Sequence, residues 1–113
     1  MKNLRNTVRL VGRLGMDPKV NKFKNGTQVV SFSLATDESY NNKEGERVEN
    51  TQWHQITVWR GLSKVAEKYL KKGMEVTIEG RLVHRNYEDK NGKTIYVTEV
   101  EAQDLLMMSK KAS

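Results

Sequence analysis

A chain of 113 residues is the size of one ordinary domain, and its 36% hydrophobic and 30% charged residues are typical of a protein that folds on its own. Lysine and arginine total 20 against 14 acidic residues, a net charge of +6 that would attract a polyanion such as a nucleic acid, although solubility alone can explain the same excess. The absence of cysteine excludes disulfides, thiolate zinc sites and a cysteine nucleophile, and it suits a reducing compartment.

Two half-buried strands are predicted in the first third of the chain. Residues 6–15 alternate apolar and charged side chains, and Gly12 interrupts them where a barrel would need a bend or bulge. After an Asn-Gly turn at residues 25–26, residues 28–36 alternate again. One face of this second strand carries Val30, Phe32 and Leu34, which we expect in the core.

The next segment is polar and the strand after it has two unlike faces. Residues 37–50 lack an apolar period and predict a long hairpin loop of the kind that often carries function. Residues 52–59 form the third strand. One face carries Trp53, Gln55, Thr57 and Trp59, and the other carries His54, Ile56 and Val58.

A change of period predicts one helix over residues 62–72. Its apolar stripe consists of Leu62, Val65, Ala66, Tyr69 and Leu70, so we expect Tyr69 in the core. Lys71 and Lys72 suit the carboxyl end of a helix, and Gly73 supplies a terminating residue.

Two further strands follow, over residues 74–87 and 94–108, joined by a turn at 89–93. Three strands, one helix and two strands predict an all-β protein: an OB-fold, a five-stranded closed or partly open barrel with its helix between strands three and four. An open antiparallel sheet with a docked helix is the alternative. We expect one domain over residues 1–108 and a short, basic, disordered tail over 109–113.

The inventory of catalytic groups is thin. His54 and His84 lie on different strands without metal-ligand spacing, and no glycine-rich phosphate loop is present. His54 shares a face with Ile56 and Val58, which favours a packed or interface histidine. We therefore expect no enzyme, no metal and no cofactor.

Aromatic and basic side chains favour a binding function instead. Two polar residues separate Trp53 from Trp59 on one strand face, which suits exposed flat rings better than a buried face. Arg81, Arg85 and Tyr87 share a face of the fourth strand, and Tyr40 lies in the long loop beside Lys43. Single-stranded nucleic acid is bound by such mixtures of cations and rings, although tryptophans in small barrels are often core or interface residues.

Longer sequence motifs point to one protein family. The stretches VRLVGRLGMDPKV, NGTQVVSFSLATDESY and TQWHQITVWRGLSKVAEKYLKKGMEVTIEGRL, with the YED turn, resemble the bacterial-type single-stranded DNA-binding protein (SSB) family over about residues 4–108. The resemblance implies an OB-fold that assembles as a homotetramer, binds single-stranded DNA with little sequence preference, and coats it during replication, recombination and repair.

The resemblance also implies roles for individual residues. The family's stacking aromatics correspond to Tyr40, Trp53, Trp59 and Tyr87, and its basic positions to Lys43, Lys71, Lys72 and Arg85. On physical grounds we add Arg9, Arg13, Arg60 and Arg81 as phosphate contacts. His54 matches a residue that contacts the neighbouring subunit.

Other expectations concern the compartment and the partners. Residues 1–6 are no secretory signal and no hydrophobic run could span a bilayer, which predicts a cytoplasmic, nucleoid-associated protein, or one of an organelle matrix or a phage-infected cell. Family members typically continue into an acidic tip that recruits replication and repair proteins, whereas this chain ends MMSKKAS, which leaves recruitment in doubt. An RNA-binding or primosomal OB-fold and a purely structural oligomer are the rival functions.

Overall fold

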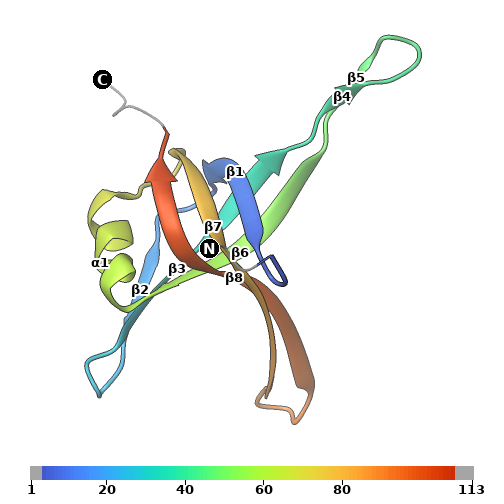
Figure 1. Ribbon diagram of the computed structural model, residues 1–113. Coiled ribbons are helices and arrows are strands. Elements are labelled where there is room, and N and C mark those ends of the chain that lie inside the picture. The colour runs from blue at the N-terminus through green and yellow to red at the C-terminus, as the bar shows by residue number, and fades with distance from the viewer. Residues whose placement is uncertain (1–3, 109–113) are drawn as a thin grey trace.

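The computed structural model describes residues 4–108 of the chain, so the expected tail at 109–113 lies outside the described residues. Figure 1 shows a barrel of curved strands with one helix packed against its side. In chain order the elements are β1 (Val8–Leu14), β2 (Lys19–Lys22), β3 (Gln28–Asp37), β4 (Tyr40–Asn41), β5 (Arg47–Val48), β6 (Thr51–Trp59), α1 (Arg60–Tyr69), β7 (Glu75–Glu88) and β8 (Thr94–Met107).

The barrel closes because β1 pairs with two different strands. The sheet order is β1-β7-β8-β6-β3-β2, and an additional β1–β3 pairing at Arg13 and Leu14 closes five strands into a ring, with β2 outside it. Gly12 lies at this junction, where an added Cβ would come 2.3 Å from the carbonyl oxygen of Ala35. The close approach of β1 to β3 therefore requires glycine. The sequence predicted a bend or bulge at Gly12; the pairing of β1 with β7 runs through Gly12 without a register shift, so there is no bulge at this position. The predicted OB-fold barrel is confirmed.

The core fills the barrel with apolar side chains from every strand of the ring. Val30, Phe32 and Leu34 are fully buried, as predicted, and Ile56 and Val58 of β6 meet them from the neighbouring strand. The fully or nearly buried set also includes Leu14, Ala66, Leu70, Val76, Ile78 and Val100.

The helix differs from its prediction. It spans Arg60–Tyr69 and ends at an extended Leu70, so Lys71, Lys72 and the left-handed Gly73 lie in the turn beyond it. Its core face carries Ser63, Ala66 and Leu70, while Tyr69 is 47% exposed. The prediction that Tyr69 lies in the core was therefore wrong, and Val65 of the same predicted stripe is also exposed. Ser63 can take the buried position because its hydroxyl donates a hydrogen bond to the carbonyl of Arg60.

Three hairpins project from the barrel (Figure 1). The first is β2–β3, whose short strand β2 the sequence did not reveal. The second, β4–β5, occupies the segment predicted as a long hairpin loop. The third is the outer half of β7–β8, which pairs as far as Glu88 and Thr94. The Cα radius of gyration is 16.2 Å, above the roughly 13 Å of a compact domain of this size. The projecting hairpins account for the difference.

Candidate functional site

One outer face of the barrel leaves two tryptophans uncovered. Trp53 and Trp59 of β6 are 61% and 38% exposed, which confirms the prediction that these rings are exposed, although Thr57 on the same face is buried. Their cross-strand neighbours on β3 are Ala35 opposite Trp53 and Val29 opposite Trp59, with Ser33 and Ser31 between. Because these partners are small or medium-sized, nothing tall on β3 covers the rings, and the face is open to a flat ligand.

Trp53 is positioned by the backbone of a neighbouring turn. An added Cβ on Gly15 would lie 2.3 Å from Cζ3 and 2.7 Å from Cη2 of the indole. Gly15 itself is anchored to β3, where its amide donates to the carbonyl of Ser33 at 3.0 Å. The ring thus contacts the backbone of Gly15, while 61% of Trp53 stays exposed.

Trp59 stacks on a ring that the sequence reasoning missed. Its indole and the ring of Phe23 lie 6.1 Å apart between centroids with an interplanar angle of 10°. Phe23 follows β2 and is 48% exposed. The available signal was a lone aromatic between Lys22 and Lys24 just before the Asn-Gly turn, and its meaning depends on the folding of β2–β3 back onto β6.

A hollow of about 390 Å³ adjoins this ring pair. Its lining includes Trp59 and Arg85, which are two of the predicted binding residues, together with Phe23, Thr57 and Glu99. Arg85 Nε donates to Glu99 Oε1 at 2.6 Å, and the Glu99 side chain is only 6% exposed. The guanidinium compensates the buried carboxylate and is held beside the rings by it.

The other two predicted stacking rings lie on the projecting hairpins. Tyr40 is exposed on β4, and Lys43 lies in the turn at the tip of the same hairpin. Tyr87 is exposed near the outer end of β7. Tyr96 of β8, which the sequence could not place, is the most exposed aromatic of residues 4–108. The four predicted rings therefore form no single cluster: two lie on the barrel and two on separate arms.

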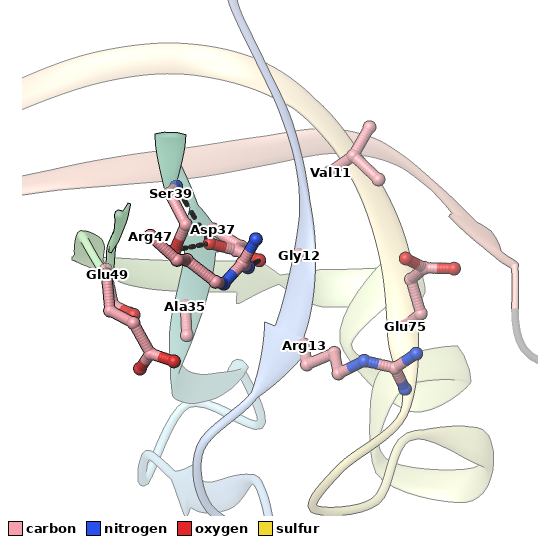
Figure 2. Close-up of a pocket in the computed structure, with 10 residues that line it drawn as sticks. Val11, Gly12, Arg13, Ala35, Asp37, Ser39, Arg47, Glu49 and Glu75 are labelled. Atoms are coloured by element: carbon pink, nitrogen blue, oxygen red, sulfur yellow. Dashed lines mark hydrogen bonds and ion pairs between the residues drawn. The ribbon is translucent and has the colours of Figure 1, made fainter. Parts of the chain in front are cut away.

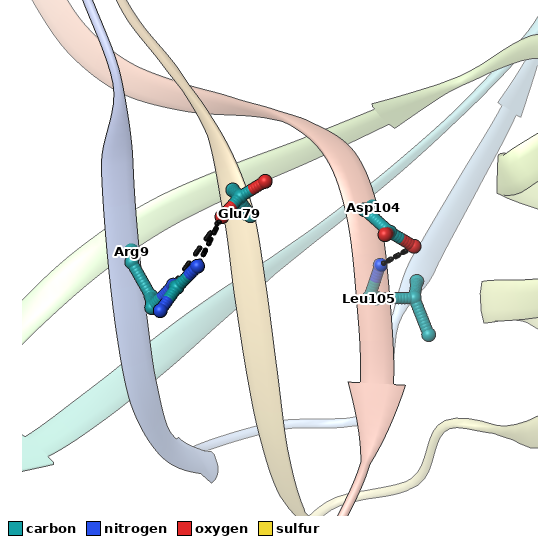
Figure 3. A network of polar contacts seen from close by, with 4 residues as sticks. All are labelled: Arg9, Glu79, Asp104 and Leu105. Carbon is teal, nitrogen blue, oxygen red and sulfur yellow. Dashed lines mark hydrogen bonds and ion pairs between the residues drawn. The ribbon is translucent and has the colours of Figure 1, made fainter. Parts of the chain in front are cut away.

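Several of the predicted phosphate-binding arginines already have carboxylate partners. Arg9 pairs with Glu79 at 2.7 Å (Figure 3), and Arg81 pairs with Glu101 at 3.4 Å. Arg85 pairs with Glu99 as described. By contrast, no ion pair is found for Lys43, Lys71, Lys72 or Arg60 within the part of the chain that the structure describes.

Arg13 lines a second hollow, between β1 and the base of the β4–β5 hairpin (Figure 2). Its guanidinium donates to the carbonyl of Gly73 at 3.0 Å. Across the hollow, the hydroxyl and the amide of Ser39 donate to the Asp37 carboxylate, and together with nearby Arg47 they hold the pKa of Asp37 below its usual range. The carboxylates of Asp37, Glu49 and Glu75 in this hollow offset the guanidinium groups of Arg13 and Arg47, so its lining carries no excess of positive charge to attract a phosphate.

The remaining predicted residues lie in the helix, in the turn after it and on the opposite side of β6. Lys71 and Lys72 occupy the α1–β7 turn, where the amide of Lys72 donates to Asp17 at 2.9 Å. Arg60 begins α1 with a left-handed φ of 57°, directly after Trp59. His54 is half-buried on the side of β6 opposite Trp53, with Nε2 3.0 Å from the hydroxyl of Thr36.

Within residues 4–108, no group of acidic or histidine side chains could hold a metal ion. In the same range, no helix is long and apolar enough to cross a membrane.

Comparisons with known proteins agree on one family. Residues 5–108 match the model of the Single-strand binding protein family. The chain is 45% identical to the single-stranded DNA-binding protein of Neisseria meningitidis over 103 residues, covering 91% of this chain and 59% of the relative. It is 37% identical to single-stranded DNA-binding protein 1 of Xylella fastidiosa, over 94% of this chain and 79% of that one. The chain thus spans about three fifths of the Neisseria relative's length.

A solved structure shares the fold. It is described as a Plasmodium falciparum SSB complex with single-stranded DNA, and it superposes with a TM-score of 0.84 at 30% identity. The match covers 96% of this chain and 99% of that one.

Proposed function

The chain belongs to the single-strand binding protein family, and from this premise we propose that it binds single-stranded DNA with little sequence preference. Bases stack on Tyr40, Trp53, Trp59 and Tyr87, while lysine and arginine side chains contact the phosphates. The protein coats and protects exposed strands in replication, recombination and repair, and it catalyses no reaction.

The observation that carries this proposal is the open face of β6. Two tryptophans are exposed there. Exposing large apolar rings to water is unfavourable, so their exposure suggests that a ligand covers them. Each ring offers a flat surface that any base can stack on, for about 1–3 kcal/mol per base. Because stacking contacts the face of a base and not its hydrogen-bonding edge, the binding tolerates any sequence.

The charge pattern divides the phosphate contacts into two groups. Lys43, Lys71, Lys72 and Arg60 offer cations without carboxylate partners among the described residues. Arg9, Arg81 and Arg85 are already paired, so a phosphate must share each of them with a carboxylate. We therefore assign most of the electrostatic attraction to the first group. Arg13, whose guanidinium donates to the carbonyl of Gly73, should contribute an intermediate amount.

We also propose that the protein works as a homotetramer in the cytoplasm, associated with the nucleoid. An exposed apolar strip supports self-association: Val11 and Leu106 lie on either side of Thr77 across β1, β7 and β8. His54, on another surface, is the proposed second contact between subunits.

Tryptophan fluorescence during titration with poly(dT) tests the function. Strong quenching at low salt is expected, with weaker competition from a matched RNA oligomer. If gel mobility shows binding but the tryptophan fluorescence is not quenched, the stacking mechanism is overturned. Absence of binding in both measurements would overturn the function itself.

A further inference from the structure

The β2–β3 hairpin extends the open face of the barrel beyond Trp59. Strand register places Asn21 of β2 opposite Val29 of β3, and Val29 opposite Trp59 of β6, so these residues form one row across three strands. Phe23 lies two residues after Asn21, and its ring stacks on the Trp59 indole. All four residues line the hollow beside the ring pair. A ring of the hairpin therefore continues the exposed aromatic surface of β6.

Phe23 is held in place by the turn that follows it. Its amide donates to the carbonyl of Thr27 at 2.8 Å, and its carbonyl accepts from the amide of Gly26 at 2.9 Å. The side chain of Asn25 accepts a further hydrogen bond from the Thr27 amide at 2.9 Å. Because the backbone of this turn is already ordered, a ligand that contacts the ring loses little affinity to the ordering of the hairpin.

The Phe23 ring keeps a large accessible surface although it stacks on Trp59. Phe23 is 48% exposed and Trp59 is 38% exposed. Carbon atoms of rings in contact lie about 3.5–4.0 Å apart. A separation of 6.1 Å between the centroids at an interplanar angle of 10° therefore means that the two rings are displaced sideways and cover each other only in part. The accessible part of Phe23 lies outside the stack, where a base can cover it.

The charge of the hairpin is uniformly positive. Residues 18–36 include Lys19, Lys22 and Lys24 and no acidic residue. All three lysines are exposed, and within residues 4–108 none of them forms an ion pair with a carboxylate. Two of them are the chain neighbours of Phe23. A phosphate beside this ring therefore meets cations that it does not have to share with a carboxylate, in contrast to the paired arginines of β1 and β7.

We propose that the β2–β3 hairpin is a further contact for the single strand, in which Phe23 stacks a base and Lys22 and Lys24 bind the adjoining phosphates. The inference rests on the proposed function and extends it, since it carries the strand from Trp59 onto an arm that holds none of the four stacking rings assigned above. Exposed rings beside unpaired cations are the combination that binds single strands. Because Phe23 offers only the face of its ring, this contact adds affinity without a preference for one base.

Three substitutions of Phe23 separate a base contact from mere support of the Trp59 ring. Phe23→Ala should lower the affinity for oligo(dT) by roughly 5- to 150-fold, the equivalent of one lost base stack. Phe23→Leu keeps an apolar contact for Trp59 but has no flat ring, so its affinity should stay low, whereas Phe23→Trp should bind at least as tightly as the wild type. Wild-type affinity of Phe23→Leu would show that the ring only supports Trp59, which overturns the inference.

A fluorescent reporter detects the same contact directly. Phe23→Trp combined with Trp53→Phe and Trp59→Phe leaves a single tryptophan, at the hairpin. Its fluorescence should be quenched when poly(dT) binds, because a base stacked on an indole quenches its emission. Unquenched fluorescence in a complex that gel mobility shows to have formed would overturn the inference.

Lys22→Ala and Lys24→Ala test the phosphate contacts. Each should reduce the slope of log affinity against log salt concentration by about 0.7. Lys64→Ala is the matched control, because Lys64 is an exposed lysine of α1 that likewise has no ion pair among the described residues, and its slope should equal that of the wild type. Equal reductions in all three variants would show a general effect of net charge and no contact at the hairpin.

The outcomes distinguish this inference from the proposed function. If the wild type binds oligo(dT) and every hairpin variant binds it equally tightly, the hairpin contact is overturned and the proposed function stands. If the wild type itself fails to bind oligo(dT), the proposed function is overturned.

Discussion

The indole of Trp53 lies against the Cα of Gly15, with no space for a methyl group between them. A glycine in the β1–β2 turn thus determines how close the Trp53 ring of β6 lies to the barrel backbone, although the two residues are far apart in the chain. The turn is itself tied to β3 through the Gly15–Ser33 hydrogen bond, so the ring has a rigid support.

Gly15→Ala should therefore weaken strand binding without unfolding the protein. The added Cβ forces the Trp53 ring away from its support, so we expect part of the stacking free energy of about 1–3 kcal/mol to be lost. Poly(dT) titration and thermal unfolding measure the two effects. Gly61→Ala is the control, because a Cβ there meets nothing within 4 Å and alanine favours the helix. Equal affinities of Gly15→Ala and wild type would contradict the support role.

Trp53→Ala tests the ring directly. Because most of the indole is exposed, its removal exposes little core, and the unfolding temperature should change only slightly. Affinity for poly(dT) should fall by roughly 5- to 150-fold, the equivalent of one lost base stack. Phe32→Ala provides the contrast, since Phe32 is fully buried and its loss should cost about 3–5 kcal/mol of stability. Unfolding of Trp53→Ala would show that the ring belongs to the core.

Salt dependence should distinguish the partnered from the unpartnered cations. Each phosphate contact with a single strand contributes about 0.7 to the slope of log affinity against log salt concentration. Lys43→Ala should reduce the slope by about that amount. Arg9→Ala should reduce it less, because Glu79 already neutralises Arg9 in the free protein. Equal reductions would show that the ion pair opens fully when the strand binds.

His54 is expected to act on assembly rather than on the strand. It lies on the side of β6 opposite Trp53, so His54→Ala should lower the mass measured by light scattering while each chain still quenches on binding poly(dT). His84→Ala, which alters the other histidine, should leave the mass unchanged. A tetrameric His54→Ala protein would place the subunit contact elsewhere.

Acid should loosen the base of the β4–β5 hairpin through Asp37. Hydrogen bonds from Ser39 lower the pKa of this carboxyl, so the ionised form stabilises the fold at pH values above the unfolded pKa of about 4. That contribution is lost as the pH falls through the lower pKa of the folded state. Carboxyl NMR titration should show the depressed pKa, and amide exchange at Ser39 should accelerate in acid. In Asp37→Asn this acceleration should disappear; an undepressed pKa for Asp37 would contradict the assignment.

Local periodicity was enough to predict the five long strands of the barrel, but not the short strands β2, β4 and β5. Alternation along residues 28–36 and 52–59 identified Val30, Phe32 and Leu34 as core and Trp53 and Trp59 as outward, since a strand reverses side-chain direction at every residue. The apolar stripe predicted for the helix is rotated relative to the face that the structure buries. The reason is that Ser63, a small polar residue, occupies a core position that an apolar pattern cannot reveal. Tyr69 was misplaced for the same reason.

The sequence by itself therefore determined the family, the barrel and the outward direction of its rings, all of which follow from short-range patterns and motifs. Tertiary structure decided what those rings and cations touch. The Phe23–Trp59 stack, the Gly15 support under Trp53 and the Arg85–Glu99 pair each join segments distant in the chain. Their meeting depends on strand register and barrel closure, which alternation within one strand does not encode.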